Sequence, residues 1–201
     1  APFDAVTPAA AAAARAALGA APGTPVAVHV GRFHHWKGQQ VLLRALAQVP
    51  DLHAWFVGAP LFGEDAFDAE LRALATALGV ASRARFTGFR DDVPTLLRAA
   101  DVVVHSSVYP EPFGRVVVEG MLAGRPVIAA NAGGVPEIVT DGDTGILVPP
   151  GDPAALAAAL RRVTADPAAA AAMGARGRAR AREVFSVAAM VRGVRAALDE
   201  P

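Results

Sequence analysis

The sequence predicts an α/β fold in which helices cover both faces of a doubly wound, mostly parallel six-stranded sheet, followed by a helical tail. Six short apolar runs alternate with segments of helical spacing, which is the pattern of βαβ units. Hydrophobic residues make up 53% of the 201 residues, enough for the core of one large domain. After residue 150 the chain has only helical patterns. We expect the strands at residues 25–31, 53–58, 84–87, 101–105, 126–130 and 145–148.

The predicted helices begin or end at residues suited to those positions. Aspartate and serine side chains accept hydrogen bonds from the first N–H groups of a helix, and glycine often ends one. We expect helices at 39–49 and 65–78, one beginning near Phe113 or Gly114, a short one after 131–137, and three beyond residue 150. The expected caps and stops are Gly19, Gly79, Asp91 or Asp92, Asp152, Asp166 and Ser186.

Residues 1–25 differ in composition from the rest of the chain. Prolines and a glycine set among many alanines indicate a linker or N-terminal appendage. Residues 9–20 favour a helix because alanine has the highest helix propensity, although low complexity also permits a flexible linker. We therefore divide the chain into residues 1–25, a binding domain at 26–185 and a C-terminal helix at 186–201.

Charge and composition exclude several classes of protein. Lys+Arg and Asp+Glu are both 19, so no overall basic field favours nucleic acid or an anionic membrane. The chain has no cysteine, which excludes disulfides and thiolate metal sites. No apolar run reaches the roughly 20 residues needed to cross a bilayer, and no signal peptide is visible. We expect no membrane span, no nucleic-acid partner and a cytoplasmic location.

The stretch 105–125, HSSVYPEPFGRVVVEGMLAGR, is the most informative part of the sequence. Pro112 suits a helix start, and Gly114 lets the backbone approach a ligand closely. The free N–H groups of the first helical turn can bind phosphate. Glu111 before the helix and Glu119 within it can bracket a ligand lying along the helix start. The alternative is an ordinary helix with one buried and one solvated glutamate.

Two cations in the loop after the first strand complement these carboxylates. Arg32 and Lys37 suit a diphosphate, although two solvated surface cations are the alternative. His34 and His35 are expected to be exposed loop residues, since no carboxylate stands at metal-ligand spacing, and we expect no metal. Trp36 is expected to pack.

Residues that follow strands share one edge of a parallel sheet, where ligands bind. Gly133 and Gly134 are expected either to form only a tight turn there or to present N–H groups to an anion as well. Glu137 is expected in the first turn of the next helix. The residues expected at this edge are Arg32, Lys37, Gly58, Phe89, Arg90, Glu111, Gly114 and Gly133.

Several common motifs are absent from the sequence. No GxGxxG follows the first strand, which argues against a dinucleotide cofactor. GxxxxGK[ST] and GxSxG are also absent, so neither a P-loop nor a serine hydrolase is indicated.

Taken together, these segments resemble the carboxyl-terminal domain of retaining, GT-B-fold glycosyltransferases of the group 1 family. The resemblance covers roughly residues 26–165, in the family's order. Its most specific element is the E-x7-E spacing from Glu111 to Glu119. The matching segments are VGRFHHWKGQQVLLRALA, RFTGFRDDVPTLLRAADVVVHSS, EPFGRVVVEGMLAGRPVIA and NAGGVPEIVTDGDTGILVPPGDPAALAAAL.

The resemblance implies a Rossmann-like half of a GT-B enzyme that binds a nucleotide-sugar donor and transfers a hexose-type sugar. Glu119 should bind the ribose and Glu111 the transferred sugar, where it helps stabilise the transition state. Arg32 and Lys37 should neutralise the diphosphate, and the loop at Phe89 and Arg90 should receive the base. Further donor contacts are implied for the main chain of Gly31, Phe113, Gly114, Arg115 and Val116.

The resemblance also implies that no cofactor or metal is needed and that an N-terminal domain supplies the acceptor site. Without that domain we expect the chain to be inactive. UDP, GDP and ADP remain open as the nucleotide. The alternatives are a non-catalytic module that senses nucleotide sugars, another GT-B activity such as an epimerase or phosphorylase, and a natural stand-alone protein.

Overall fold

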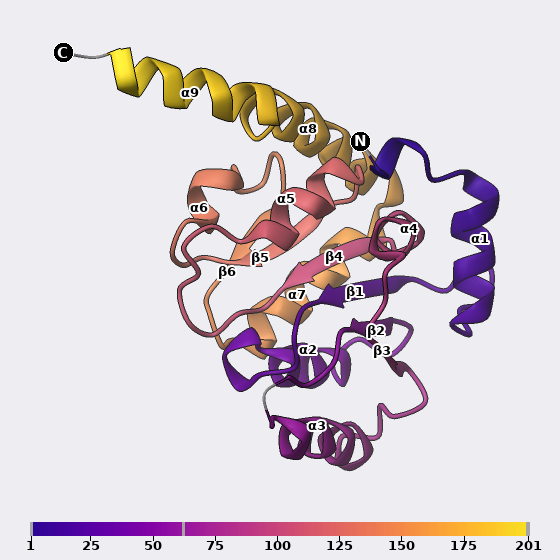
Figure 1. Cartoon of the computed structure of the whole chain (residues 1–201). Coiled ribbons are helices and arrows are strands. Elements are labelled where there is room, and N and C mark those ends of the chain that lie inside the picture. Colours follow the sequence, from indigo (N-terminus) through magenta and orange to yellow (C-terminus); the bar gives the residue numbers. More distant parts are fainter. Residues whose placement is uncertain (1, 62, 200–201) are drawn as a thin grey trace.

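The computed structural model describes residues 2–61 and 63–199 and contains a six-stranded parallel sheet between two layers of helices (Figure 1). The strand order is β3-β2-β1-β4-β5-β6, with every neighbouring pair parallel. The doubly wound sheet predicted from the sequence is confirmed. Its strands are β1 (Val26–Val30), β2 (His53–Val57), β3 (Ala84–Gly88), β4 (Val102–His105), β5 (Val127–Ala130) and β6 (Ile146–Val148).

The helices follow the predicted alternation with small shifts at their ends. The helix predicted at 39–49 ends at Leu46, and part of the loop before it forms the short helix η2. The main helices are α1 (Pro8–Ala17), α2 (Gln39–Leu46), α3 (Asp65–Ala77), α4 (Val93–Ala99), α5 (Arg115–Leu122), α6 (Val135–Ile138), α7 (Pro153–Ala165), α8 (Pro167–Val184) and α9 (Val187–Asp199), with two 3-10 turns, η1 (Pro2–Asp4) and η2 (His35–Lys37).

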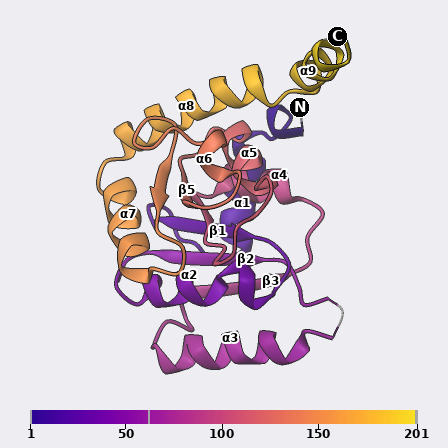
Figure 2. The same ribbon diagram turned by 90° about the vertical axis from the view of Figure 1, so that its left-hand side faces the viewer.

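The two faces of the sheet carry separate cores. Figure 2 shows the helices around the sheet from a second direction. Helices α2, α3 and α7 contribute Leu42, Leu71 and Leu156 to one core. Helices α4 and α5 contribute Leu97 and Met121 to the other. Because both faces are buried, the inner strands β1, β2, β4 and β5 are mostly apolar and do not alternate, whereas the edge strand β3 carries the exposed Arg85.

Helix α1 packs against α4 and is joined to the sheet by one arginine. Arg15 donates to the carbonyl of Ala99 at 2.8 Å, to Asp101 at 3.0 Å and to the carbonyl of Thr24. Asp101 also accepts from the N–H of Val26 at 2.8 Å, at the start of β1. The predicted alanine helix is therefore confirmed and is a packed element, with Gly19 just beyond its end at φ 78°. The division into three domains stays a prediction.

The predicted caps of the last three helices are confirmed. Asp152 accepts from the N–H groups of Ala154 and Ala155 at 2.9 Å, and Asp166 caps α8 in the same way. Ser186 accepts from the N–H of Ala189 at 3.1 Å. Helix α9 extends beyond the rest of the molecule (Figure 1) and exposes an apolar face formed by Val187, Met190, Val191, Val194 and Leu198.

One expectation about a helix start was wrong, and another was confirmed to within one residue. Asp92 occupies the N-cap position of α4, but it makes no capping hydrogen bond because Arg90 binds its carboxylate. Helix α5 begins at Arg115, one residue later than the nearer prediction, with Gly114 as its N-cap at φ 82°. Within residues 2–61 and 63–199, no helix combines the length and apolar character that crossing a membrane requires.

Candidate functional site

The loop after β1 and the loop after β4 meet through an ion pair. Lys37 Nζ lies 2.8 Å from Glu111 Oε1, although the two residues are 74 positions apart in the chain. Both follow strands that are neighbours in the sheet. This geometry agrees with the expectation that Lys37 and Glu111 face each other at the carboxyl edge of the sheet.

Glu111 is held by three donors. His105 Nε2 lies 3.0 Å from Oε1, and Lys37 and Ser107 donate to the same oxygen. Burial would raise the pKa of Glu111, but the hydrogen bonds from His105, Lys37 and Ser107 outweigh burial. They hold the pKa of this carboxyl well below its ordinary 4.5, so Glu111 is ionised.

Glu119 has a different environment. Its side chain is 31% exposed and lies 3.6 Å from Arg115, one helical turn earlier. Burial raises the pKa of Glu119 and Arg115 opposes this only weakly. Since the Glu111 side chain is 22% exposed, neither glutamate is fully solvated, and the alternative of one buried and one solvated residue was wrong.

Glycines let the loops around Glu111 pack backbone against backbone. A Cβ on Gly133 would lie 2.1 Å from the carbonyl oxygen of Glu111, and one on Gly134 would lie 2.3 Å from that of Pro112. The Gly134 N–H donates to the Glu111 carbonyl at 2.9 Å. One of the two N–H groups suggested for an anion is therefore already used, and the pair supports the Glu111 loop by close packing.

The start of α5 lies in the same region. The N–H of Val117 bonds to the carbonyl of Gly114 at 3.0 Å. The N–H groups before it, those of Arg115 and Val116, belong to the first turn, where an α-helix provides no acceptor. These groups and the helix dipole favour an anion next to Glu111 and Lys37.

The first loop carries the other predicted cation. The Arg32 guanidinium carbon lies 5.7 Å from the centre of the Trp36 ring, and the Arg32 carbonyl accepts from Gln39 at 2.9 Å. Trp36 is 42% exposed, and it packs against neighbours in its own loop, with its ring centre 4.5 Å from that of His34. Gly31 touches the second loop closely, because a Cβ on Gly58 would lie 2.0 Å from the Gly31 carbonyl oxygen.

Phe89 and Arg90 follow β3, which is the edge strand of the sheet. Phe89 is 82% exposed. The Arg90 guanidinium forms a two-point pair with Asp92 at 2.7 Å, which raises the pKa of Arg90. At the end of β3, the groups that can contact a ligand are therefore the exposed ring of Phe89 and the main chain.

Sequence reasoning missed a carboxylate near the paired histidines. His34 Nε2 lies 3.0 Å from Glu64 Oε1, and ligand atoms of His34, His35 and Glu64 all lie within 4.8 Å of one another. His34 Nδ1 accepts from the N–H of Trp36 at 3.3 Å, so Nε2 carries the proton and donates to Glu64. Both ring nitrogens of His34 are thus used in hydrogen bonds.

His29 lies beneath the first loop and supports Lys37. It is buried, and its Nε2 donates to the Lys37 carbonyl at 3.0 Å. Burial lowers the pKa of His29 to about 4, so the ring is neutral at ordinary pH. Sequence reasoning missed His29, His105 and Ser107 as well. The available signal was their position at the ends of β1 and β4, at the edge where the ligand site was predicted.

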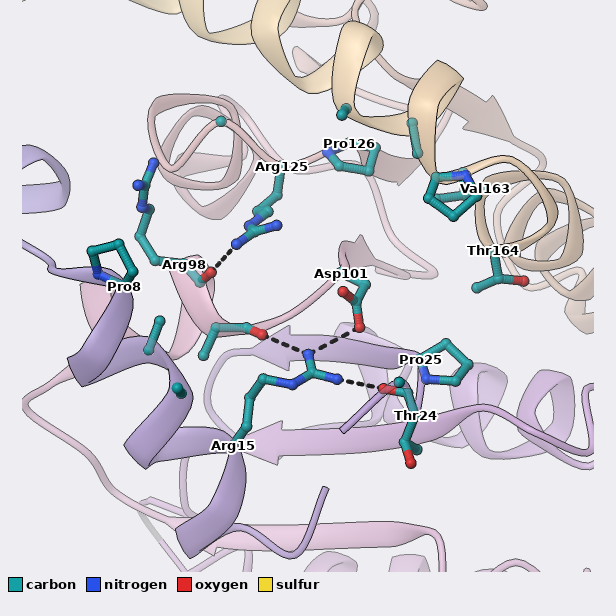
Figure 3. Close-up of a pocket in the computed structure, with 18 residues that line it drawn as sticks. Pro8, Arg15, Thr24, Pro25, Arg98, Asp101, Arg125, Pro126, Val163 and Thr164 are labelled. Carbon is teal, nitrogen blue, oxygen red and sulfur yellow. Dashed lines mark hydrogen bonds and ion pairs between the residues drawn. The ribbon is translucent and has the colours of Figure 1, made fainter. Parts of the chain in front are cut away.

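Two cavities lie at opposite edges of the sheet. The one at the carboxyl edge has a volume of about 240 Å³ and is lined by Trp36, Lys37, Tyr109, Pro110, Glu111 and Pro112. The larger one, about 690 Å³, lies at the amino edge (Figure 3). It is lined by α1, the end of α4, the end of α7, the start of α8 and the loops before β1, β4 and β5.

The arginines of the larger cavity are occupied with backbone carbonyl groups. Arg15 donates to the carbonyl of Ala99 and Arg125 to that of Arg98 (Figure 3). Arg98 donates to the carbonyl of Ala123 at 3.2 Å. The accepting residues lie at or just after the C-terminal ends of α4 and α5, where carbonyl groups lack helical partners. These arginines therefore stabilise helix ends, and the smaller cavity is the one lined by the predicted site residues Lys37 and Glu111.

Comparison with known proteins decides the family. A family model described as "Glycosyl transferases group 1" matches residues 11–180. The chain belongs to this family. A "D-inositol 3-phosphate glycosyltransferase" from Mycobacterium sp. (strain KMS) is 44% identical over 148 residues, which is 73% of this chain and 34% of that protein. The chain thus spans about a third of the length of this curated relative.

Solved structures of similar proteins share the fold. Anabaena Alr3699/HepE, solved in complex with UDP and glucose, has a TM-score of 0.91 and 40% identity, covering 97% of this chain and 53% of that one. The C-terminal domain of the group 1 protein LpcC from Francisella tularensis has a TM-score of 0.75 and 28% identity, covering 83% and 88%. The six-stranded sheet is therefore one half of a GT-B fold, as expected from the sequence.

Proposed function

We propose that this chain is the donor-binding domain of a retaining glycosyltransferase that transfers a hexose-type sugar from a UDP-sugar. The observation that carries this proposal is the Lys37–Glu111 pair beside the first turn of α5 at the carboxyl edge of the sheet. Family membership and the similarity to HepE, whose solved complexes include UDP-glucose, support UDP as the nucleotide.

In this proposal the diphosphate lies at the start of α5. Lys37 and Arg32 supply positive charge, and the N–H groups of Phe113 to Val116 add hydrogen bonds. As the sugar leaves, negative charge builds on the departing phosphate while the sugar gains oxocarbenium character. Cations and a helix N-terminus already aimed at that phosphate lower the barrier, because they need no reorganisation during the reaction.

The two glutamates have separate roles in this proposal. Glu111, ionised and held in place, accepts hydrogen bonds from sugar hydroxyls and stabilises the developing positive charge. Glu119, whose charged form is disfavoured by burial and has one weak partner, accepts from the ribose hydroxyls. The base rests on the main chain near Gly31, Phe89 and Arg90. No cofactor or metal takes part in this scheme.

We further propose that a second domain of the same polypeptide supplies the acceptor site and that this chain alone does not transfer sugar. The chain spans only about a third of the first curated relatives and about half of the similar full structures. The exposed apolar face of α9 is consistent with contact to further polypeptide. A cytoplasmic location stays a prediction.

Replacing Glu119 by glutamine tests the ribose contact. We expect calorimetry to show UDP binding by the 201-residue chain and about tenfold weaker binding by Glu119→Gln, since a charge-assisted hydrogen bond is lost. Glu137→Gln removes a charge from the exposed first turn of α6 and is the matched control. Equal affinities for Glu119→Gln and the control would remove Glu119 from the site. Absence of UDP binding at millimolar concentration would contradict the proposed function.

A further inference from the structure

His105 is the last residue of β4 and one of the few buried polar residues of the sheet. The three residues before it are valines, so its position continues an apolar strand. Its Nε2 lies 3.0 Å from Glu111 Oε1. Because an ionised carboxylate can only accept, Nε2 carries the proton and donates it to this hydrogen bond.

The other ring nitrogen of His105 has no hydrogen-bond partner among the described residues, although it is buried. An unpaired buried polar atom lowers stability by about 1–3 kcal/mol. An apolar side chain would avoid this cost at the end of a strand of valines. The stability of the fold therefore gives no reason for a histidine here, and its contact with Glu111 does.

In the proposed function, a bound diphosphate draws one of the three donors to Glu111 away and leaves the other two in place. Lys37 is the charged donor on a flexible stem, and in the proposed function it turns toward the phosphates. His105 and Ser107 lie on the strand end and the segment directly after it, on side chains shorter than that of Lys37. When Lys37 moves, these two residues still hold the Oε1 atom of Glu111.

We propose that His105 is a positioning residue that, with Ser107, holds the Glu111 carboxylate in place so that it recognises the sugar of the donor. This inference rests on the proposed function and assigns His105 to recognition of the sugar, separately from recognition of the nucleotide. The hydrogen bonds from His105 and Ser107 occupy one carboxylate oxygen, and the other oxygen accepts from the hydroxyl groups of the sugar. Binding of UDP alone does not depend on this arrangement.

The test compares UDP and UDP-glucose by calorimetry in His105→Leu, His105→Gln and Ser107→Ala. We expect His105→Leu to lower the affinity for UDP-glucose about threefold to tenfold, the worth of one hydrogen bond, while UDP affinity changes less than twofold. Glutamine can donate from a similar position, so His105→Gln should recover most of the loss. His53→Leu, at the far end of β2, is the control and should leave both affinities unchanged.

The outcomes separate this inference from the proposed function. If no protein binds UDP, the proposed function fails. If UDP binds and the UDP-glucose to UDP affinity ratio is the same in His105→Leu, His105→Gln and the parent chain, the positioning role is wrong. If His105→Leu does not fold, Ser107→Ala must lower that ratio, and an unchanged ratio in Ser107→Ala overturns the proposal. Equal losses for UDP and UDP-glucose would mean that His105 acts only on the structure of the loop.

Discussion

Replacing Lys37 by alanine is expected to weaken UDP binding about 10-fold to 100-fold, because a charge-assisted contact with phosphate contributes about 1.5–3 kcal/mol. The substitution also removes one of the three donors to Glu111. Calorimetry with UDP measures the loss, and repeating it at high salt should shrink the difference between parent and variant.

Arg44→Ala is the matched control for Lys37→Ala. Arg44 is exposed on α2, so its removal changes the net charge by the same amount without touching the site. We expect the control to bind UDP as the parent does. Equal affinities for Lys37→Ala and the parent would show that Lys37 only neutralises Glu111 and does not contact the phosphates.

Acid is expected to destabilise the chain through His29. Burial lowers the pKa of His29 from 6.5 to about 4. Between these two pH values the ring is protonated in the unfolded chain and neutral in the folded chain. The contribution of this group is therefore complete above pH 6.5 and is lost as the pH falls toward 4. A difference of this size corresponds to about 3 kcal/mol.

Urea unfolding of the parent and His29→Gln between pH 7 and pH 4 measures this effect. Glutamine does not titrate, and its amide can still donate to the Lys37 carbonyl. Other groups titrate in both proteins, so the difference between the two curves isolates His29. We expect the free energy of unfolding of the parent to fall more steeply with acid. Parallel curves would show that His29 is protonated in the folded chain and that its burial has little cost.

Local sequence signals predicted most of the fold. The strands, the caps at Asp152, Asp166 and Ser186, and the stop at Gly19 depend on neighbouring residues, and all are present. Asp92 failed as a cap because Arg90, two residues away, binds its carboxylate instead. Such a competition between side chains depends on rotamers and is not visible in residue spacing.

The site was predictable only where topology determines proximity. Lys37 and Glu111 could be placed together because both follow neighbouring parallel strands. His34 lies in the loop after β1 and Glu64 in the loop after β2, and their contact is made by side chains. The spacing of residues in the sequence does not indicate such a contact. The bond from His105 to Glu111 depends on how the side chain at the end of β4 turns toward the next loop, which the apolar strand pattern did not reveal.

The most direct test of the donor site is an NMR titration of the 201-residue chain with UDP, followed through assigned backbone amides. We predict that the largest shifts occur at the carboxyl edge of the sheet, in residues 31–38, 88–90 and 113–119, with saturation at one site. Shifts confined to the amino-edge cavity around Arg15, Arg98 and Arg125, or no shifts at millimolar UDP, would contradict it.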